Sequence, residues 1–286
     1  MKFEPYMLVV NSGQRTDRAF RNIPGFKTKS IVVEELRYHN LYGYTAVIIA
    51  SWSRDITLSQ NTTKLVNFVN DGGILVCLGC QCHEAQWIPF CKWENGEPTN
   101  EFWSDNNEDS RLILDGIDKN HLDFHGFIGH GTIEPPPNTK DICTGDGKSV
   151  MCLIDEEVKG AALITTIDPD FHAFMGRISR KQNETECRKE AKLLLVNIYR
   201  WSLYKFNEKH SVSSYFMRKL IGSVKMSNFY LVLALPTWII SVYVSAIYIY
   251  KNNTYDPFIA IPSAASMIGL AIMMTDKFLE RKRIAN

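Results

Sequence analysis

The sequence predicts an α/β domain with a mostly parallel sheet flanked by helices, followed by a C-terminal transmembrane helical hairpin. Short apolar runs alternate with helical patterns over residues 1–210, and this alternation is typical of strand–helix–strand units. Beyond them lie two apolar runs without ionisable residues, 229–250 and 258–275. The first is long enough to cross a bilayer as a helix, and the shorter second run needs flanking residues at the interface.

Four apolar or β-branched runs indicate buried strands of one sheet. They are Met7–Val10, Ser30–Val33, Ala46–Ala50 and Ile74–Leu78. Between the third and the fourth, Leu58–Asn70 places apolar residues at helical spacing, with Ser59 as N-cap and two glycines as the stop. We therefore expect a helix to connect two parallel strands here.

The later part of the globular region closes the sheet. Lys148–Ile154 and Gly160–Ile167 are joined by a short acidic segment, and they indicate a hairpin or two adjacent strands. Glu184–Phe206 has the pattern of a long amphipathic helix. We expect residues 1–210 to form one cytosolic domain with both helices and strands.

The C-terminal region is predicted to be a juxtamembrane connector (211–228), two membrane spans and a basic tail (276–286). Basic residues flank the hairpin on both outer sides, whereas the loop between the spans carries only Lys251. The positive-inside rule then places both termini in the cytosol and makes the chain an integral membrane protein. Seven cysteines without a disulfide-type spacing agree with a reducing compartment.

The composition limits which classes of partner the chain is expected to bind. A net charge of +1 and the lack of a basic stripe interleaved with aromatics argue against nucleic acid. The lipid bilayer is the expected partner, and no cofactor is expected. Small residues four apart in each span allow close helix approach, either within the hairpin or in a homo-oligomer or a complex with another membrane protein.

The segments 46–50, 68–73 and 74–81 together resemble the class I glutamine amidotransferase-like fold, a flavodoxin-like α/β fold, including its trehalose-utilisation-type relatives. The resemblance covers about residues 5–205. Amidotransferases carry a strand-to-helix elbow G-x-C-x-G-x-Q with a nucleophilic cysteine. Here the elbow keeps Cys77, Gly79 and Gln81, but its first glycine is replaced by Leu75. The resemblance implies Cys77 as the nucleophile and the backbone N–H of Leu78 as an oxyanion donor.

The second signature of this family, His-Pro-Glu after a late strand, departs here in a way that decides the functional prediction. The matching residues are Asp168-Pro169-Asp170, so Asp168 stands where the family has its general base. A carboxylate is a poor base toward a thiol and raises the pKa of a nearby thiol. His125, His130 and His172 remain as replacements that the sequence alone cannot place.

Other residues near the elbow suggest a binding crevice or a metal site. Trp52 and Arg54 follow the third strand at its carboxyl end, where open α/β sheets bind ligands, and aromatic residues crowd a loop-rich insertion after the elbow. A zinc site is a weaker alternative, since thiolates and imidazoles cluster here. Its ligands would come from Cys80, Cys82, His83 and Cys91.

These observations support three hypotheses for function. The leading one is a non-catalytic, membrane-anchored amidotransferase-like domain that senses an unknown small molecule or a partner. Its crevice would be built from Cys77, Asp168 and their neighbours, with Trp52, Arg54, Leu78, Gln81 and His130 as the ligand-binding residues. The second is a thiol hydrolase that uses Cys77 with His125 or His172 as the base and Asp168 or Asp170 in support. The third is a structural subunit of a membrane complex.

Overall fold

In the computed structural model of this chain, the described residues are 5–12, 16–21, 23–53, 55–79, 89–174 and 183–210. The predicted connector, both predicted membrane spans and the basic tail lie outside these ranges. Within the described ranges, no helix is both long enough and apolar enough to cross a membrane.

The described residues form an α/β structure around a ten-stranded mixed sheet. One half is parallel, in the order β2-β1-β3-β4-β10. Its strands are β1 (Tyr6–Asn11), β2 (Lys27–Val32), β3 (Ala46–Ile49), β4 (Ile74–Cys77) and β10 (Ala161–Thr165). The other half is antiparallel and continues from β10 through β9, β7 and β5, while β8 pairs with β9 and β6. Its strands are β5 (Lys92–Asn95), β6 (Phe102–Trp103), β7 (Gly131–Glu134), β8 (Lys140–Gly145) and β9 (Lys148–Ile154).

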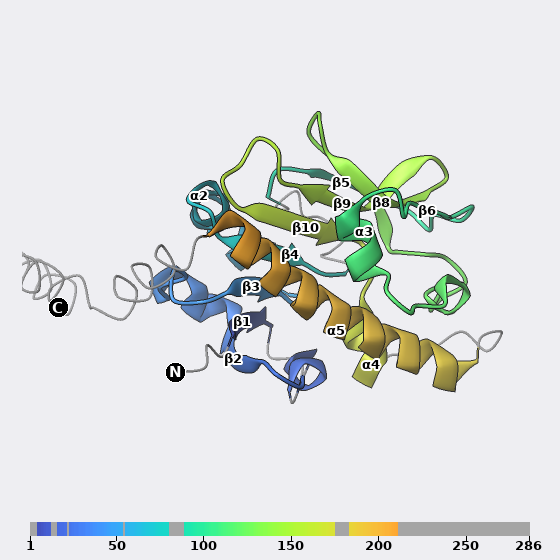
Figure 1. The fold of residues 1–286 in the computed structure, drawn as a ribbon, viewed down its shortest axis with the longest axis horizontal. Coiled ribbons are helices and arrows are strands. Elements are labelled where there is room, and N and C mark those ends of the chain that lie inside the picture. The colour runs from blue at the N-terminus through green and yellow to red at the C-terminus, as the bar shows by residue number, and fades with distance from the viewer. Residues whose placement is uncertain are drawn as a thin grey trace, which may run out of the picture. The chain divides into compact units, whose positions relative to one another are not determined.

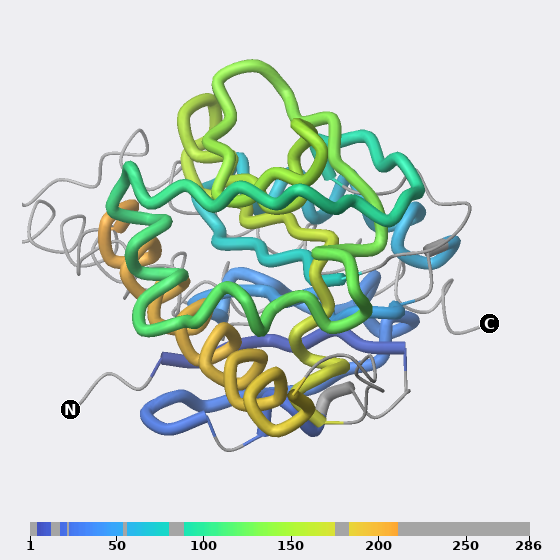
Figure 2. Tube along the Cα trace, turned by 90° about the vertical axis from the view of Figure 1, so that its right-hand side faces the viewer, coloured from blue at the N-terminus to red at the C-terminus, as the bar shows by residue number. Residues whose placement is uncertain are grey.

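The α/β class is confirmed, but the prediction of a mostly parallel sheet is wrong. The link between β9 and β10 is too short for a parallel crossover, so the two strands pair antiparallel. The aromatic insertion, which the sequence indicated as loop-rich, adds β5 and β6 to the same half. Figure 2 shows this green segment on the side of the sheet away from the blue strands β1 and β2.

Both faces of the parallel strands are buried, and successive residues alternate between two apolar clusters. On one face, Met7 and Val9 pack in the same cluster as residues of α5. On the other face, Leu8 and Val10 join residues of α2 and of the 3-10 helix η2. Figure 1 shows α5 lying along one face of the sheet, with α4 near the amino-terminal end of α5. These helices are α2 (Thr62–Asn70), η2 (Val33–Tyr38), α4 (Pro169–Phe174) and α5 (Glu184–Lys209).

The predicted single helix 58–70 is in fact two helices, α1 (Asp55–Ser59) and α2. Ser59 is the last residue of α1, and its hydroxyl donates to the Ile56 carbonyl at 2.7 Å, so it does not cap α2. Asn61 separates the two helices. Its backbone N–H donates to Leu58 and its side-chain amide donates to Thr57, both at 2.8 Å, and these bonds close α1. The remaining short helices are η1 (Thr16–Phe20), α3 (Glu108–Ile113) and η3 (Lys119–His121).

A buried ion cluster holds the carboxyl-terminal part of α5 against the rest of the domain. The side chain of Lys205 is 3% exposed, and its Nζ lies 2.9 Å from carboxylate oxygens of both Asp109 and Asp155. Burial alone would raise the pKa of Asp155, but the hydrogen bonds from Lys205 and Lys140 lower that pKa below its ordinary value. One residue beyond α5, the His210 ring Nε2 lies 2.6 Å from the Gly72 carbonyl oxygen. The end of α5 is therefore fixed on the sheet.

Replacing Lys205 by methionine keeps the apolar stem but removes the cation that pairs with buried Asp109 and leaves Asp155 with Lys140 as its remaining cation. We expect Lys205→Met to lower the free energy of unfolding at pH 7 by about 3–5 kcal/mol, the usual cost of breaking a buried pair from one side. Because the folded-state pKa of Asp155 is lowered, its stabilising contribution is present above the unfolded pKa of about 3.9 and is lost as the pH falls. Denaturant unfolding at pH 7 and at pH 3 measures both effects.

Lys192→Met is the matched control, since Lys192 is exposed on the same helix. It should change the free energy of unfolding by less than about 0.5 kcal/mol. A Lys205→Met protein as stable as this control would show that the cluster does not hold α5.

Candidate functional site

The candidate site lies where β3, β4 and β10 end, because parallel neighbours present their carboxyl ends at one edge. Gly79, just beyond β4, is wedged between Ser51 and Asp168. Its N–H donates to the Ile167 carbonyl at 2.7 Å, and its φ is +68°. A Cβ here would overlap the Ser51 side chain and lie 2.8 Å from the Asp168 Cβ. Glycine is therefore required at this position.

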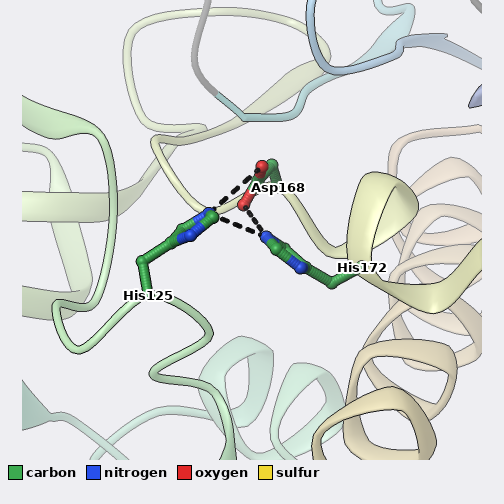
Figure 3. Close-up of side chains that lie close together, drawn as sticks. All are labelled: His125, Asp168 and His172. Carbon is green, nitrogen blue, oxygen red and sulfur yellow. Dashed lines mark hydrogen bonds and ion pairs between the residues drawn. The ribbon is translucent and has the colours of Figure 1, made fainter. Parts of the chain in front are cut away.

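Asp168 is the centre of the site. Its side chain is 2% exposed, and the His172 Nε2 lies 3.3 Å from its Oδ1. The Nε2 atoms of His130 and His125 lie 3.5 and 4.0 Å from its Oδ2. Figure 3 shows that His125 and His172 also point toward each other, with their Nε2 atoms 2.8 Å apart. The indole N–H of Trp52 donates to Asp168 Oδ2 at 3.4 Å. We call Asp168, His125, His130 and His172 the histidine–aspartate cluster.

Three segments bring this cluster together. Asp168 follows β10 and precedes Pro169, the first residue of α4, where proline suits the start of a helix. His172 lies one turn further along α4, and its backbone N–H donates to the Asp168 carbonyl at 3.3 Å. His125 and His130 come from the segment between η3 and β7. The His130 N–H donates to the Thr166 carbonyl at 3.3 Å, so this segment is tied to the end of β10.

Burial and the imidazoles act in opposite directions on Asp168. Burial alone would raise the pKa of its carboxyl, but the interactions with His125, His130 and His172 outweigh burial and hold the pKa well below its usual range. Asp168 is therefore ionised at neutral pH. The site thus presents one buried negative charge surrounded by three imidazole rings.

Asp170 has a different role in the same loop. It is fully buried, and its carboxylate accepts the Ser51 backbone N–H at 2.9 Å and a short hydrogen bond from the Ser51 hydroxyl. Burial raises the pKa of Asp170 to about 7; the Ser51 bonds oppose this shift, while the charge of Asp168 adds to it. Asp170 therefore joins the end of β3 to the start of α4.

The cluster has a buried floor and a partly open rim. His172 and Asp168 are 0% and 2% exposed, whereas His125 and His130 are 25% and 18% exposed. Aromatic rings hold the imidazoles in place: Phe124 stacks on His172 with centroids 4.4 Å apart. Trp52, whose φ of 60° is rare for a residue with a side chain, packs against His130 edge-on. The partly exposed side chains of His125 and His130 are therefore the part of the cluster that meets solvent.

The elbow residues are placed unfavourably for thiol chemistry. Cys77 is 1% exposed in the apolar cluster that also holds Ile164 and Cys152. Burial, followed by the neighbouring Cys152, raises the pKa of the Cys77 thiol. The direction is the one expected from sequence, but carboxylates are not its cause. The backbone N–H of Leu78, expected as an oxyanion donor, donates instead to the Ile49 carbonyl at 3.0 Å.

Of the other predicted site residues, some lie within the described ranges and the rest do not. Trp52 lies at the cluster, as described above. Cys91 is buried beside Cys152, in the apolar cluster that also holds Cys77. Five predicted residues fall outside the described ranges: Arg54, Cys80, Gln81, Cys82 and His83.

The histidine–aspartate cluster allows two kinds of chemistry. The imidazoles and carboxylate can share protons, since one Nε2 of the His125–His172 pair must donate to the other when both rings are neutral. The same atoms are also ligands that divalent metal ions accept. One ligand atom each from His125, Asp168 and His172 lies within 4.8 Å of the other two.

Comparison with known proteins gives only distant structural similarity. No family model and no curated protein matches the chain. A cytoplasmic protein of Salmonella typhimurium LT2 matches with 9% identity and a TM-score of 0.49 over 68% of this chain and 98% of that one. A second cytoplasmic protein of Salmonella typhimurium matches with 9% identity and a TM-score of 0.45 over 69% of this chain and 98% of that one. A ThuA-like protein of Bacteroides uniformis matches with 9% identity and a TM-score of 0.42 over 70% of this chain and 91% of that one. At these values the comparisons do not identify a family.

Ser51 is the site residue that sequence reasoning missed. It directly follows the run Ala46–Ala50, so a small polar residue at the predicted carboxyl end of a strand was the available signal. Its partner Asp170 was expected near catalysis, but its carboxylate is occupied by Ser51. Only the folded structure shows that these residues, 119 positions apart, join two strand ends.

Gly79→Ala tests the close packing at this edge. An added methyl group meets Ser51 and Asp168, and alanine also resists the positive φ, so we expect the free energy of unfolding to fall by about 2–4 kcal/mol. Gly43→Ala is the control, because open space surrounds Gly43. Thermal or denaturant unfolding compares the two. Equal stability of both variants would mean that the strand ends are less tightly packed than described.

Cys77 should behave as a buried thiol. Since burial raises its pKa, we expect iodoacetamide at pH 7 to modify Cys77 more slowly in the native chain than in the denatured chain, by a factor on the order of 10 or more. Peptide mass mapping measures the rate at this one cysteine. Fast modification that is abolished by His125→Ala would instead favour the thiol hydrolase.

Proposed function

We propose that this chain is a membrane-anchored, non-catalytic amidotransferase-like domain that binds a ligand at the histidine–aspartate cluster and relays the bound state to its C-terminal region. One observation carries the proposal. The chemistry-bearing groups of the described fold converge on Asp168, at the position where the resembled family has its base, while the elbow thiol is buried in the apolar core.

Two features support the amidotransferase-like assignment. The parallel strands follow the order β2-β1-β3-β4-β10, which is the flavodoxin-like order 2-1-3-4-5 counted along the parallel strands. The residue after the β4 end that the family keeps as glycine, Gly79, has a positive φ and makes the close approach expected of such an elbow. The departure lies in the chemistry, because Asp168 replaces the base and Cys77 is inaccessible.

The charges at the site agree with a domain that binds its ligand but does not hydrolyse it through Cys77. Amide hydrolysis by a cysteine needs a thiolate, a base beside it and oxyanion donors. Burial raises the pKa of Cys77, and the Leu78 N–H is already bonded to the sheet. The rim formed by His125 and His130 instead gives a ligand access to an ionised carboxylate and its imidazoles.

The route from the cluster to the C-terminal region runs through α4 and α5. The Arg188 guanidinium on α5 donates to the His172 carbonyl on α4 at 2.9 Å. The 26-residue α5 is about 39 Å long, and its other end is fixed through Lys205 and His210. The chain then continues into the connector 211–228 and the predicted spans, which we place in the membrane with both termini cytosolic. A movement of His172 would reach this region through one rigid helix.

Hydrogen exchange on the full chain in phospholipid vesicles tests the relay. His125→Ala removes the ring whose Nε2 contacts His172 and so changes the cluster directly. We expect amide exchange to change by more than about twofold in α4, in α5 and in the connector.

His121→Ala is the matched control. His121 has a similar exposure, 27%, but pairs with Asp118 outside the cluster. It should leave exchange in α5 and the connector as in the wild type. If His125→Ala alters exchange only in its own segment and in α4, the cluster does not signal and the relay is wrong.

A further inference from the structure

We propose that His125, Asp168 and His172 bind a divalent transition-metal ion of the zinc class, with one coordination position left open beside His130. This inference rests on the proposed ligand-binding role and names the chemistry of the ligand. The three residues come from two chain segments, the loop before β7 and the β10–α4 junction. Each residue offers one ligand atom, and these atoms lie within 4.8 Å of one another.

The separations of the ligand atoms fit a common ion. Zinc–nitrogen and zinc–oxygen bonds of about 2.0–2.2 Å in tetrahedral geometry place neighbouring ligand atoms about 3.3–3.5 Å apart. Here the two Nε2 atoms are 2.8 Å apart, His172 Nε2 lies 3.3 Å from Asp168 Oδ1, and His125 Nε2 lies 4.0 Å from Asp168 Oδ2, so the two imidazoles face different carboxylate oxygens. With one ligand atom from each residue the separations stay within 4.8 Å, so side-chain rotations are needed to bring all three atoms to one centre.

Proton placement also favours a cation. If His172 Nε2 carries the hydrogen of the His125–His172 contact, the His125 Nε2 presents a lone pair to an ionised carboxylate. If His125 carries it, the His172 Nε2 presents its lone pair to Asp168 Oδ1 at 3.3 Å. In either neutral arrangement one of the two Nε2 atoms accepts this hydrogen bond and has no hydrogen to offer Asp168. A divalent ion between these atoms accepts both lone pairs and compensates the buried charge of Asp168.

The donor set selects the class of ion. Two imidazoles and one carboxylate suit zinc, iron, cobalt and similar ions, whereas magnesium and calcium require mainly oxygen ligands. His130 is not part of the compact three-residue group. Its Nε2 is buried, makes no hydrogen bond within the described part of the chain and lies 3.5 Å from Asp168. It is placed to contact whatever occupies the open position, with Trp52 beside it.

Metal binding is measured on the full chain in detergent micelles after chelator treatment. Titration with Zn²⁺ and with Co²⁺, followed by elemental analysis of the desalted protein, gives the stoichiometry, and cobalt absorption reports the ligand type. We expect one ion per chain, excess Mg²⁺ to leave it in place, and a cobalt spectrum without a thiolate charge-transfer band. His125→Ala should weaken binding by about tenfold or more, and His121→Ala should not.

Other outcomes overturn the inference. They are absence of saturable binding, equal affinity of the His125→Ala and His121→Ala variants, or loss of binding in a Cys80→Ser, Cys82→Ser variant together with a thiolate band. The last result would place the ion at the cysteine-rich segment. Failure here leaves the hydrogen-exchange relay intact if that experiment succeeds, whereas metal binding without a relay keeps the site and removes the sensing function.

Discussion

A buried negative charge at the edge of the sheet organises the candidate site. Removing a carboxylate from water is costly, and a protein retains one only where nearby groups compensate it. Asp168 meets this condition through imidazoles from two segments and the Trp52 indole N–H. The groups that compensate this charge come from the loop before β7, the start of α4 and the residues after β3, so these three segments meet at Asp168. The tight packing of Gly79 against Ser51 and Asp168 leaves no room for a side chain at that position.

The same constraint links the site to the rest of the chain. His172 sits on α4, whose carbonyl at that residue is held by Arg188 of α5, and α5 leads toward the C-terminal region. At its far end, Lys205 joins α5 to Asp109 on α3 and to Asp155, which directly follows β9. A domain built this way has few independent parts near the site. The contact between the His172 carbonyl and Arg188 joins α4 to α5 beside the cluster.

Much of this arrangement follows from local sequence, and the rest depends on how strands pair. The parallel strands and α5 were predicted from apolar runs, because burial on both faces leaves a pattern in the chain. Asp168 was identified from a motif, and His125, His130 and His172 were named as possible replacements for the base. Their convergence was not predictable, since the loop before β7 reaches β10 only through antiparallel pairing. The burial of Cys77 follows from apolar clusters that cover both faces of β4, so either face would have buried this residue.

The account places the functional chemistry of this domain at Asp168 and its imidazoles and not at the elbow thiol. The most direct test is anomalous diffraction at the zinc edge from crystals of the full chain grown with zinc. The account predicts an anomalous peak about 2.0–2.2 Å from the Nε2 atoms of His125 and His172 and from an Asp168 carboxylate oxygen. A peak at the cysteine thiolates of residues 77–91, with the Asp168 cluster empty, would contradict it.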